Sequence, residues 1–417
     1  MEELYEKVKD LCAEAKAAAP ALARASGETR NGVLSAFAAL LRKDAEKILS
    51  ANGEDMEAAR RSGLSAAMQD RLLLTPGRLE EIARAMEALV MQDDPIGLGT
   101  VQTRPNGMEI KHVRVPLGVV GVIFESRPNV SADIAGLCIK SGNAAVLRGG
   151  REAIRSNTAI VETVRQALSM YGLSQTCVSL LPFTDRAGAA ALMEMRGLID
   201  VLIPRGGKGL IQNVVENAKV PVIETGAGNC HLYIHADADA DMAISLAVNG
   251  KTSRPSVCNA IETILIHREA APALLPRLQE ELERRGVELR CCPVTLRYIQ
   301  GKAAAEADWA TEYDDLIVAV KVVDSIEEAV AHINRYSTGH SEAIVTRDLG
   351  AASYFTEAVD SACVYVNAST RFTDGGCFGL GAEVGIATQK LHARGPLGVG
   401  ALTTEKYIIS GSGQIRT

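Results

Sequence analysis

Cys258 is the residue whose surroundings most favour nucleophilic chemistry. It lies in the segment KTSRPSVCNAIET, where a loop runs into an apolar strand, with Arg254 nearby and Lys251 before it. Cationic neighbours lower the pKa of a thiol, and the thiolate is the form that attacks an acyl group or an aldehyde. The plain alternative, a small buried hydrophobic residue, describes most of the other cysteines better.

A glycine-rich turn is the second candidate. Arg205-Gly206-Gly207-Lys208-Gly209 follows a predicted strand directly and opens a predicted helix. Backbone N–H groups at a helix N-terminus bind anions such as a dinucleotide pyrophosphate or a phosphorylated substrate. The turn lacks a complete G-x-G-x-x-G pattern, so a simple tight turn between strand and helix remains the alternative.

Four polar residues lie at strand ends or in loops. Arg148 ends a predicted strand, where ligands bind in open α/β sheets, and a guanidinium there can hold an adenosine 2′-phosphate. Asn129 follows another strand, and its amide can donate to a developing oxyanion. Glu224 and Glu312 can each serve as a base or accept from a ribose hydroxyl. Each also has a structural alternative as a surface, turn or solvated residue.

The predicted secondary structure that must position these residues changes its pattern near residue 113. Residues 1 to about 95 have helical apolar spacing throughout. Afterwards short, nearly continuous apolar runs alternate with segments of helical length, which predicts a doubly wound parallel sheet and then a second α/β block. The strand-like runs of the first block span residues 115–125, 144–149, 177–183, 198–204 and 220–224.

Two segments fall outside both blocks. The sequence of residues 101–114 predicts a hairpin around Asn106-Gly107, because that dipeptide favours a two-residue turn. The tail ends in one more strand-like piece, KYIISG. We expect the hairpin and the tail strand to pair with a neighbouring subunit.

Composition limits the classes of protein. The chain has 417 residues, 47% apolar and 23% charged, with net charge −7, so we expect two or three globular domains and no nucleic-acid partner. It shows no signal peptide and no apolar run long enough for a membrane span. Nine cysteines without a C-x-x-C pair predict reduced thiols in the cytoplasm, and seven scattered histidines predict no metal site.

Taken in order, these features resemble the aldehyde dehydrogenase superfamily. They are a strand followed by Pro-Asn, the Gly142–Arg148 segment, the glycine-rich turn, a Glu-x-Gly segment and a lone downstream cysteine. Longer blocks are similar to the gamma-glutamyl phosphate reductase family, also called glutamate-5-semialdehyde dehydrogenases, over essentially the whole chain. These blocks are ESRPNVSADIAGLCIKSGNAAVLRGGREAIRSN, RPSVCN, AHINRYSTGHSEAI and VNASTRFTDGGCFGLGAEVGIATQKLHARGPLG.

The resemblance implies an aldehyde-dehydrogenase-like fold with three parts. The first is a Rossmann-type NADP(H)-binding domain made of residues 1–100 and 115–229 with part of 371–400. The second is an α/β catalytic domain of residues 230–370. The third is a small oligomerisation flap of residues 101–114 and 401–417, which implies a homodimer or homotetramer.

The resemblance also implies the reaction. Members of the family reduce L-glutamyl 5-phosphate with NADPH to L-glutamate 5-semialdehyde and phosphate, in proline biosynthesis. Cys258 matches the nucleophile that forms a thioester, and Asn129, with the backbone N–H of Cys258, matches the oxyanion donors. No kinase domain accompanies the chain, so the resemblance implies a separate glutamate 5-kinase that supplies the acyl phosphate.

Cofactor and substrate residues follow from the same resemblance. Arg148 matches the basic position near the adenosine ribose, Glu312 matches the carboxylate that holds the nicotinamide ribose, and Gly206, Gly207 and Lys208 form the phosphate-binding turn. Arg127, Arg254 and Arg371 are candidates for the anionic groups of the substrate.

Two other functions compete with this one. An aldehyde-oxidising dehydrogenase would hydrolyse the thioester with water, and Glu224 would then be the base. A relative without catalytic activity would serve as a binding protein, although Cys258, Asn129 and Arg148 together argue against that.

Overall fold

The structure is a computed structural model that describes residues 2–416. By their internal contacts the residues form two compact units. Unit 1 contains residues 1–224, 379–385 and 397–417, and unit 2 contains residues 225–378 and 386–396. Within residues 2–416, no helix is both long enough and apolar enough to cross a membrane.

The first part of unit 1 is helical, as the apolar spacing predicts. Thr75 caps the fifth helix through its hydroxyl, which accepts from the backbone N–H of Arg78 at 3.1 Å, and Pro76 follows at the first helical position. The five helices are α1 (Glu2–Arg24), α2 (Gly27–Lys43), α3 (Ala45–Arg61), α4 (Ala66–Leu72) and α5 (Pro76–Met91).

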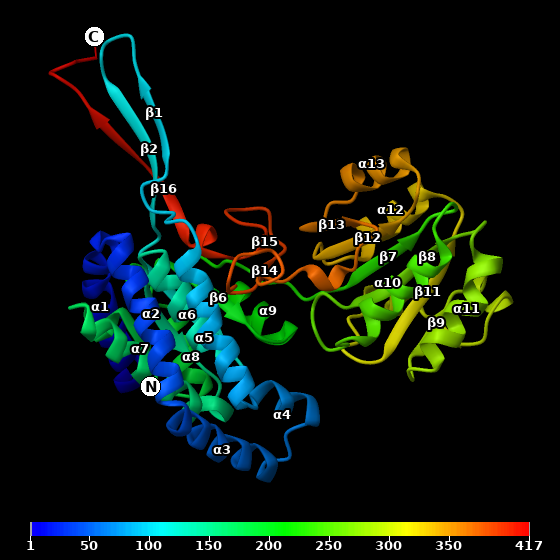
Figure 1. Cartoon of the computed structure of the whole chain (residues 1–417), viewed down its shortest axis with the longest axis horizontal. Helices are drawn as coiled ribbons and strands as arrows, with labels where there is room; N and C mark the ends of the chain where they lie inside the picture. Colours follow the sequence, from blue (N-terminus) through cyan, green and yellow to red (C-terminus); the bar gives the residue numbers. More distant parts are fainter. Residues whose placement is uncertain (1, 417) are drawn as a thin grey trace. The chain divides into compact units, whose positions relative to one another are not determined.

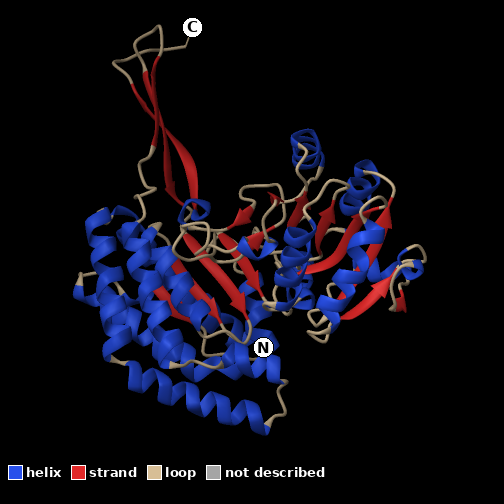
Figure 2. Ribbon diagram, turned by 45° about the vertical axis from the view of Figure 1, so that its right-hand side comes forward, coloured by secondary structure: helices blue, strands red, loops and turns tan. Residues whose placement is uncertain are grey.

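Unit 1 contains a four-stranded parallel sheet in the order β5-β4-β3-β6. Val119 and Ile123 share an apolar cluster with α1, while the alternating Val120 and Val122 are also fully buried, so both faces of the sheet are covered (Figure 2). The strands are β3 (Val119–Phe124), β4 (Ala144–Arg148), β5 (Val178–Leu180) and β6 (Val201–Arg205), and the helices between or after them are α6 (Asn129–Lys140), α7 (Ile154–Met170), α8 (Arg186–Met193) and α9 (Lys208–Asn217).

The prediction of one further strand in this sheet is wrong. Residues 220–224 make only an isolated bridge, between Val222 and Leu202 of β6. The backbone N–H of Leu202 donates to Pro221 at 2.8 Å, and that of Ile223 donates to Leu202 at 3.0 Å. Pro221 has no N–H to donate, which is the physical reason that the ladder does not extend.

Unit 2 is built on a seven-stranded parallel sheet in the order β10-β9-β11-β8-β7-β12-β13 (Figure 1). Leu232 packs in a cluster with α10 and α11, and the next residue, Tyr233, packs in a second cluster with α12 and α13. The strands are β7 (Cys230–Ile234), β8 (Ile261–His267), β9 (Glu288–Cys291), β10 (Lys302–Ala303), β11 (Ile317–Val323), β12 (Ser341–Val345) and β13 (Cys363–Val366). The helices are α10 (Ala240–Thr252), α11 (Ala271–Glu283), α12 (Ile326–Tyr336) and α13 (Leu349–Ala358), and a short pair, β14 (Ile386–Ala387) with β15 (Gly395–Pro396), completes the unit.

The hairpin predicted around Asn106-Gly107 is present in unit 1. It joins β1 (Gly99–Thr103) to β2 (Glu109–Pro116), and β16 (Thr403–Ser410) pairs antiparallel along β2 (Figure 1). Most of this three-stranded ribbon is exposed, including Ile409 at 61%.

Candidate active site

Cys258 lies in the loop of residues 253–260, between the end of α10 and the start of β8. It is neither exposed nor fully buried. Its carbonyl oxygen accepts from the thiol of Cys230 at 3.2 Å, and the backbone N–H of Ala260 donates to Val257 at 2.9 Å across the turn. The predicted junction of loop and strand is confirmed, and the backbone on both sides of the thiol is fixed.

Gly228 packs directly against the backbone of Cys258. A Cβ built on Gly228 would lie 1.4 Å from the carbonyl oxygen of Cys258 and 2.7 Å from its Cα, so only glycine fits there. The backbone N–H of Gly228 donates to the Glu312 carboxylate at 2.7 Å. Glu312, predicted to hold a ribose, thus reaches the segment that lies against Cys258.

Arg371 is the best-defined cation near the thiol. Its Nε donates to the Ser253 hydroxyl at 2.9 Å, and its Nη1 donates to the side chain of Asn259, the residue after Cys258. Burial and then the neighbouring Arg254 lower the pKa of Arg371, while the charge of Cys258 acts to raise it. Arg371 therefore interacts electrostatically with both Cys258 and Arg254.

Lys251, the other cation that the sequence places near Cys258, has a buried carboxylate partner. It is 0% exposed, and its ammonium lies 2.5 Å from the carboxylate of Glu262, itself 1% exposed. Lys251 is thus bonded to Glu262 in the fold, and its effect on the thiol pKa stays a prediction. Arg254 and Arg371 are the other candidates for that role.

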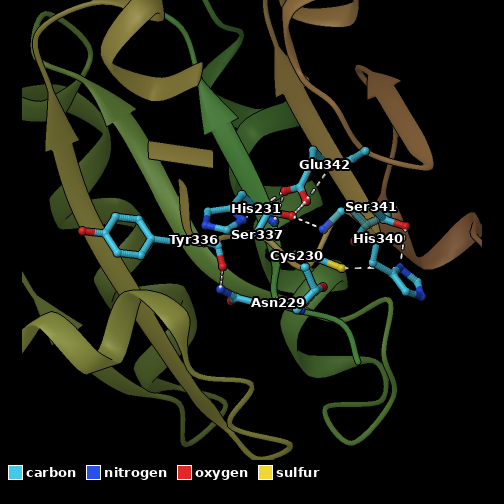
Figure 3. A network of polar contacts seen from close by, with 12 residues as sticks. Asn229, Cys230, His231, Tyr336, Ser337, His340, Ser341 and Glu342 are labelled. Carbon is cyan, nitrogen blue, oxygen red and sulfur yellow. Dashed lines mark hydrogen bonds and ion pairs between the residues drawn. The ribbon is translucent and has the colours of Figure 1, made fainter. Parts of the chain in front are cut away.

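A buried polar network holds the segment that contacts Cys258 (Figure 3). Glu342, 0% exposed, accepts from the backbone N–H of His231 at 2.7 Å and from its ring Nδ1 at 3.0 Å. Asn229 donates from its amide to the carbonyl oxygens of Trp309 and Tyr336, both at 2.8 Å. These bonds fix the start of β7, and with it the residues just before and after Asn229.

Cys230 connects this network to Cys258. Burial, followed by the charge of Glu342, raises the pKa of its thiol well above the ordinary value. The thiol therefore stays protonated and can donate to the carbonyl of Cys258. His340 lies on its other side, with Nδ1 3.7 Å from the sulfur (Figure 3).

Asn129 begins α6 in unit 1, just beyond β3. Its amide nitrogen donates to Asp133 at 2.9 Å. A carboxylate only accepts, so this bond fixes which end of the amide is the nitrogen and leaves its second N–H for another acceptor. Arg127 lies two residues earlier, in the turn where Ser126 has a φ of 42°.

The glycine-rich turn has the local structure that the sequence predicts. β6 ends at Arg205, and α9 begins at Lys208 with Gly207 as an N-cap that has no side chain. The backbone N–H of Gly207 donates to the Glu125 carboxylate at 3.1 Å, which shows that this helix N-terminus binds anionic oxygen. Lys208 is exposed beside it.

Arg148 ends β4 but is only 8% exposed. Its Nη2 donates to the carbonyl oxygens of Thr184 and Asp185, both at 2.8 Å. Burial lowers the pKa of Arg148. Its Nε is buried and has no hydrogen-bond partner among residues 2–416, so the guanidinium retains capacity to donate to an anion.

Comparison with known proteins assigns the family. Residues 3–289 and 316–382 match the aldehyde dehydrogenase family. A gamma-glutamyl phosphate reductase of Heliobacterium modesticaldum is 55% identical over 405 residues, which cover 97% of each chain. The chain belongs to the gamma-glutamyl phosphate reductases of the aldehyde dehydrogenase family. It is accordingly an oxidoreductase.

Further relatives of this family agree. A gamma-glutamyl phosphate reductase of Carboxydothermus hydrogenoformans is 52% identical, and the match covers 99% of this chain and 100% of the relative. The crystal structure of gamma-glutamyl phosphate reductase from Thermotoga maritima is 43% identical, with a TM-score of 0.95 over 98% of this chain and 100% of that chain. The predicted aldehyde-dehydrogenase-like fold is confirmed.

Sequence reasoning missed three residues that shape the site. Gly228 and Cys230 sit in ETGAGNCH, where nothing in the pattern points to Cys258, and Glu342 is distant from it in sequence. Glu224, the alternative base, is partly buried and ends the first segment of unit 1. An open cleft of about 500 Å³ between α10 and α11 includes Asn249 and Ser253 in its lining but not Cys258.

Proposed function

We propose that this enzyme reduces L-glutamyl 5-phosphate to L-glutamate 5-semialdehyde and phosphate in proline biosynthesis, with Cys258 as nucleophile. The observation that carries the proposal is the setting of that thiol, partly exposed beside Arg254 and Arg371 on a rigidly held loop. The two arginines favour the thiolate and attract an anionic substrate. The names of the relatives supply the substrate.

Acyl transfer is the first proposed step. The Cys258 thiolate attacks the carbonyl carbon of the acyl phosphate, the bond from that carbon to the phosphate oxygen breaks, and a thioester and inorganic phosphate result. Arg254, Arg371 and Arg127 are proposed to bind the phosphate and carboxylate of the substrate. Arg371, held by Ser253 and Asn259, is the most firmly positioned of them.

Charge develops on the carbonyl oxygen in this step. We assign its stabilisation to the Asn129 amide and to the backbone N–H of Cys258. The bond from Asn129 to Asp133 supports this role, because it orients the amide and leaves its second N–H to donate.

The second proposed step is reduction of the thioester. NADPH, when bound, would supply the hydride for the acyl carbon, and Cys258 would leave as the thiolate when the carbon–sulfur bond breaks and the aldehyde is released. Glu312 is proposed to accept from the nicotinamide ribose. Because a carboxylate has several acceptor sites, its bond to Gly228 is compatible with that role.

Two features of unit 1 support binding of NADPH. Gly206, Gly207 and Lys208 open α9, whose N-terminus donates the Gly207 N–H to the Glu125 carboxylate and would donate to a phosphate in its place. Arg148 is proposed to hold the adenosine 2′-phosphate, for which its unpartnered Nε is a donor. This last assignment selects NADPH over NADH.

The same proposal includes the source of the substrate, the compartment and the oligomeric state of the enzyme. A separate glutamate 5-kinase must supply the labile acyl phosphate, and we place both activities in the cytoplasm. The strands β1, β2 and β16 are proposed as the flap that forms a homodimer or homotetramer, since β1 and β16 are largely exposed and each has one unpaired edge within the described sheet.

The reverse reaction separates this function from aldehyde oxidation. Glutamate 5-semialdehyde, supplied as its equilibrium mixture with pyrroline-5-carboxylate, is mixed with NADP⁺, and NADPH is followed with and without phosphate. Turnover that strictly requires phosphate supports acyl transfer from Cys258 to phosphate. Equal turnover without phosphate would mean that water resolves the thioester, with Glu224 as the base.

A further inference from the structure

A buried ion pair joins the two ends of the loop that carries Cys258. Lys251 is in the last turn of α10, and Glu262 is near the start of β8. The 2.5 Å contact between Nζ and Oε2 closes the loop of residues 253–260 at its base. The proposed mechanism gives neither residue a task.

Stability is a poor explanation for the Lys251–Glu262 pair. Removing two opposite charges from water costs so much free energy that well-packed apolar residues of similar volume often serve stability equally well. Oε1 of Glu262 is moreover buried without a hydrogen-bond partner among the described residues. Burial raises the pKa of Glu262 to about 8 even though Lys251 acts to lower it.

The pair also interacts with the second segment that surrounds the nucleophile. Lys251 Nζ lies 5.9 Å from the centre of the Tyr313 ring, and the charge of Glu312 acts on Glu262. Glu312 holds the N–H of Gly228, which packs on the Cys258 backbone. The pair therefore joins the two ends of the Cys258 loop and also interacts with Glu312 and Tyr313.

We propose that Lys251 and Glu262 are positioning residues that hold the Cys258 loop in its reactive geometry against the Glu312–Tyr313 segment. The inference rests on the proposed function only in taking Cys258 as the nucleophile. Its test therefore includes a reaction of the thiol that needs neither substrate nor NADPH.

The test variant is Lys251→Met combined with Glu262→Leu, which removes both charges at little cost in volume. We expect an unfolding temperature close to that of the wild type. We also expect kcat in the reverse reaction to fall roughly 10- to 100-fold, with a smaller change in KM, because small misplacements of a nucleophile have effects of that size. Alkylation of Cys258 by iodoacetamide, followed on its own peptide, slows as well.

Two internal controls accompany this variant. Cys377 is exposed, and its alkylation rate should not change. The variant Arg277→Met with Asp241→Leu removes an exposed ion pair from the start of the same helix, 2.5 Å between Nη2 and Oδ1, and should leave the alkylation of Cys258 unchanged.

A stable double variant with wild-type kcat and wild-type alkylation of Cys258 would overturn the proposal. If the double variant does not fold, Lys251→Arg takes its place, since it keeps the charge but changes its reach. Slower alkylation of Cys258 in that variant supports positioning, and an unchanged rate refutes it. If wild-type enzyme lacks reductase activity, the alkylation comparison still decides the role of the pair.

Discussion

Gly228 and Cys258 are in such close backbone contact that no side chain fits between them. The position of a Cβ on Gly228 is only 1.4 Å from the Cys258 carbonyl oxygen. The same glycine gives its N–H to Glu312 and precedes the segment fixed by Asn229 and Cys230. The backbone of Cys258 thus packs against a residue that has no side chain.

The first prediction concerns that contact. Gly228→Ala should lower kcat about 100-fold or more, because the new methyl group must displace the backbone of the nucleophile. The comparison is with Gly53→Ala, in the exposed interior of α3, where a Cβ meets nothing within 4 Å. Wild-type kcat in Gly228→Ala would show that the backbone of Cys258 need not be held there.

The second prediction tests the orientation of Asn129. Asn129→Ala should lower kcat roughly 100- to 1000-fold, as expected for a lost oxyanion donor. Asp133→Ala should lower kcat less and leave KM nearly unchanged, because this substitution only frees the Asn129 amide from its hydrogen-bond partner. Asp133→Asn keeps an acceptor oxygen and should recover most of the activity. Equal rates for Asp133→Ala and wild type would exclude Asp133 from this task.

The third prediction concerns the choice of cofactor. Arg148→Met should raise KM for NADPH roughly 10-fold or more relative to KM for NADH, the size expected for a hydrogen bond to a charged group. Arg165→Met is the matched control, since Arg165 also bonds a carbonyl oxygen beside the same sheet, that of Val178 at 2.8 Å. An unchanged ratio of the two KM values would limit Arg148 to its bonds with Thr184 and Asp185.

The fourth prediction is a dependence of stability on pH. Burial first, then His231, lowers the pKa of His332 to about 3. Between pH 6.5 and 3 the unfolded chain binds a proton that the folded chain does not, so stability falls as the pH falls. The loss from pH 7 to pH 5 should be about 2 kcal/mol.

His332→Gln should remove this loss, because glutamine does not titrate and can still accept from Lys321, which lies 3.3 Å from the ring Nδ1. Urea unfolding at pH 7 and pH 5 measures the loss of unfolding free energy. Equal losses in the variant and the wild type would place the acid sensitivity elsewhere.

Local sequence patterns predicted the helices and strands more accurately than they predicted which residues surround the candidate site. Apolar spacing predicted the helices, and the alternation of strands and helices predicted the first parallel sheet and a second α/β block, because these features depend on neighbouring residues. The run at 220–224 misled because its apolar composition masks Pro221, which cannot donate to a ladder.

The partners of charged residues depend on contacts that are distant in sequence. In the sequence Lys251 is a cation close to Cys258, but in the fold its ammonium is bonded to Glu262. Gly228 and Glu342 show no signal at all, since their importance comes from what packs against them. Cys258 could be proposed as the nucleophile from the sequence because the loop, the strand and the basic residues around it are local.

The most direct test of the central claim is to look for the thioester on Cys258. The enzyme is mixed with glutamate 5-semialdehyde and NADP⁺ without phosphate, and NADPH and the mass of the Cys258 peptide are measured together. The account predicts one equivalent of NADPH per active site, a glutamyl group on Cys258, and its release when phosphate is added, with none of these in Cys258→Ala. Continuous NADPH formation without phosphate, or a burst that persists in Cys258→Ala, would contradict it.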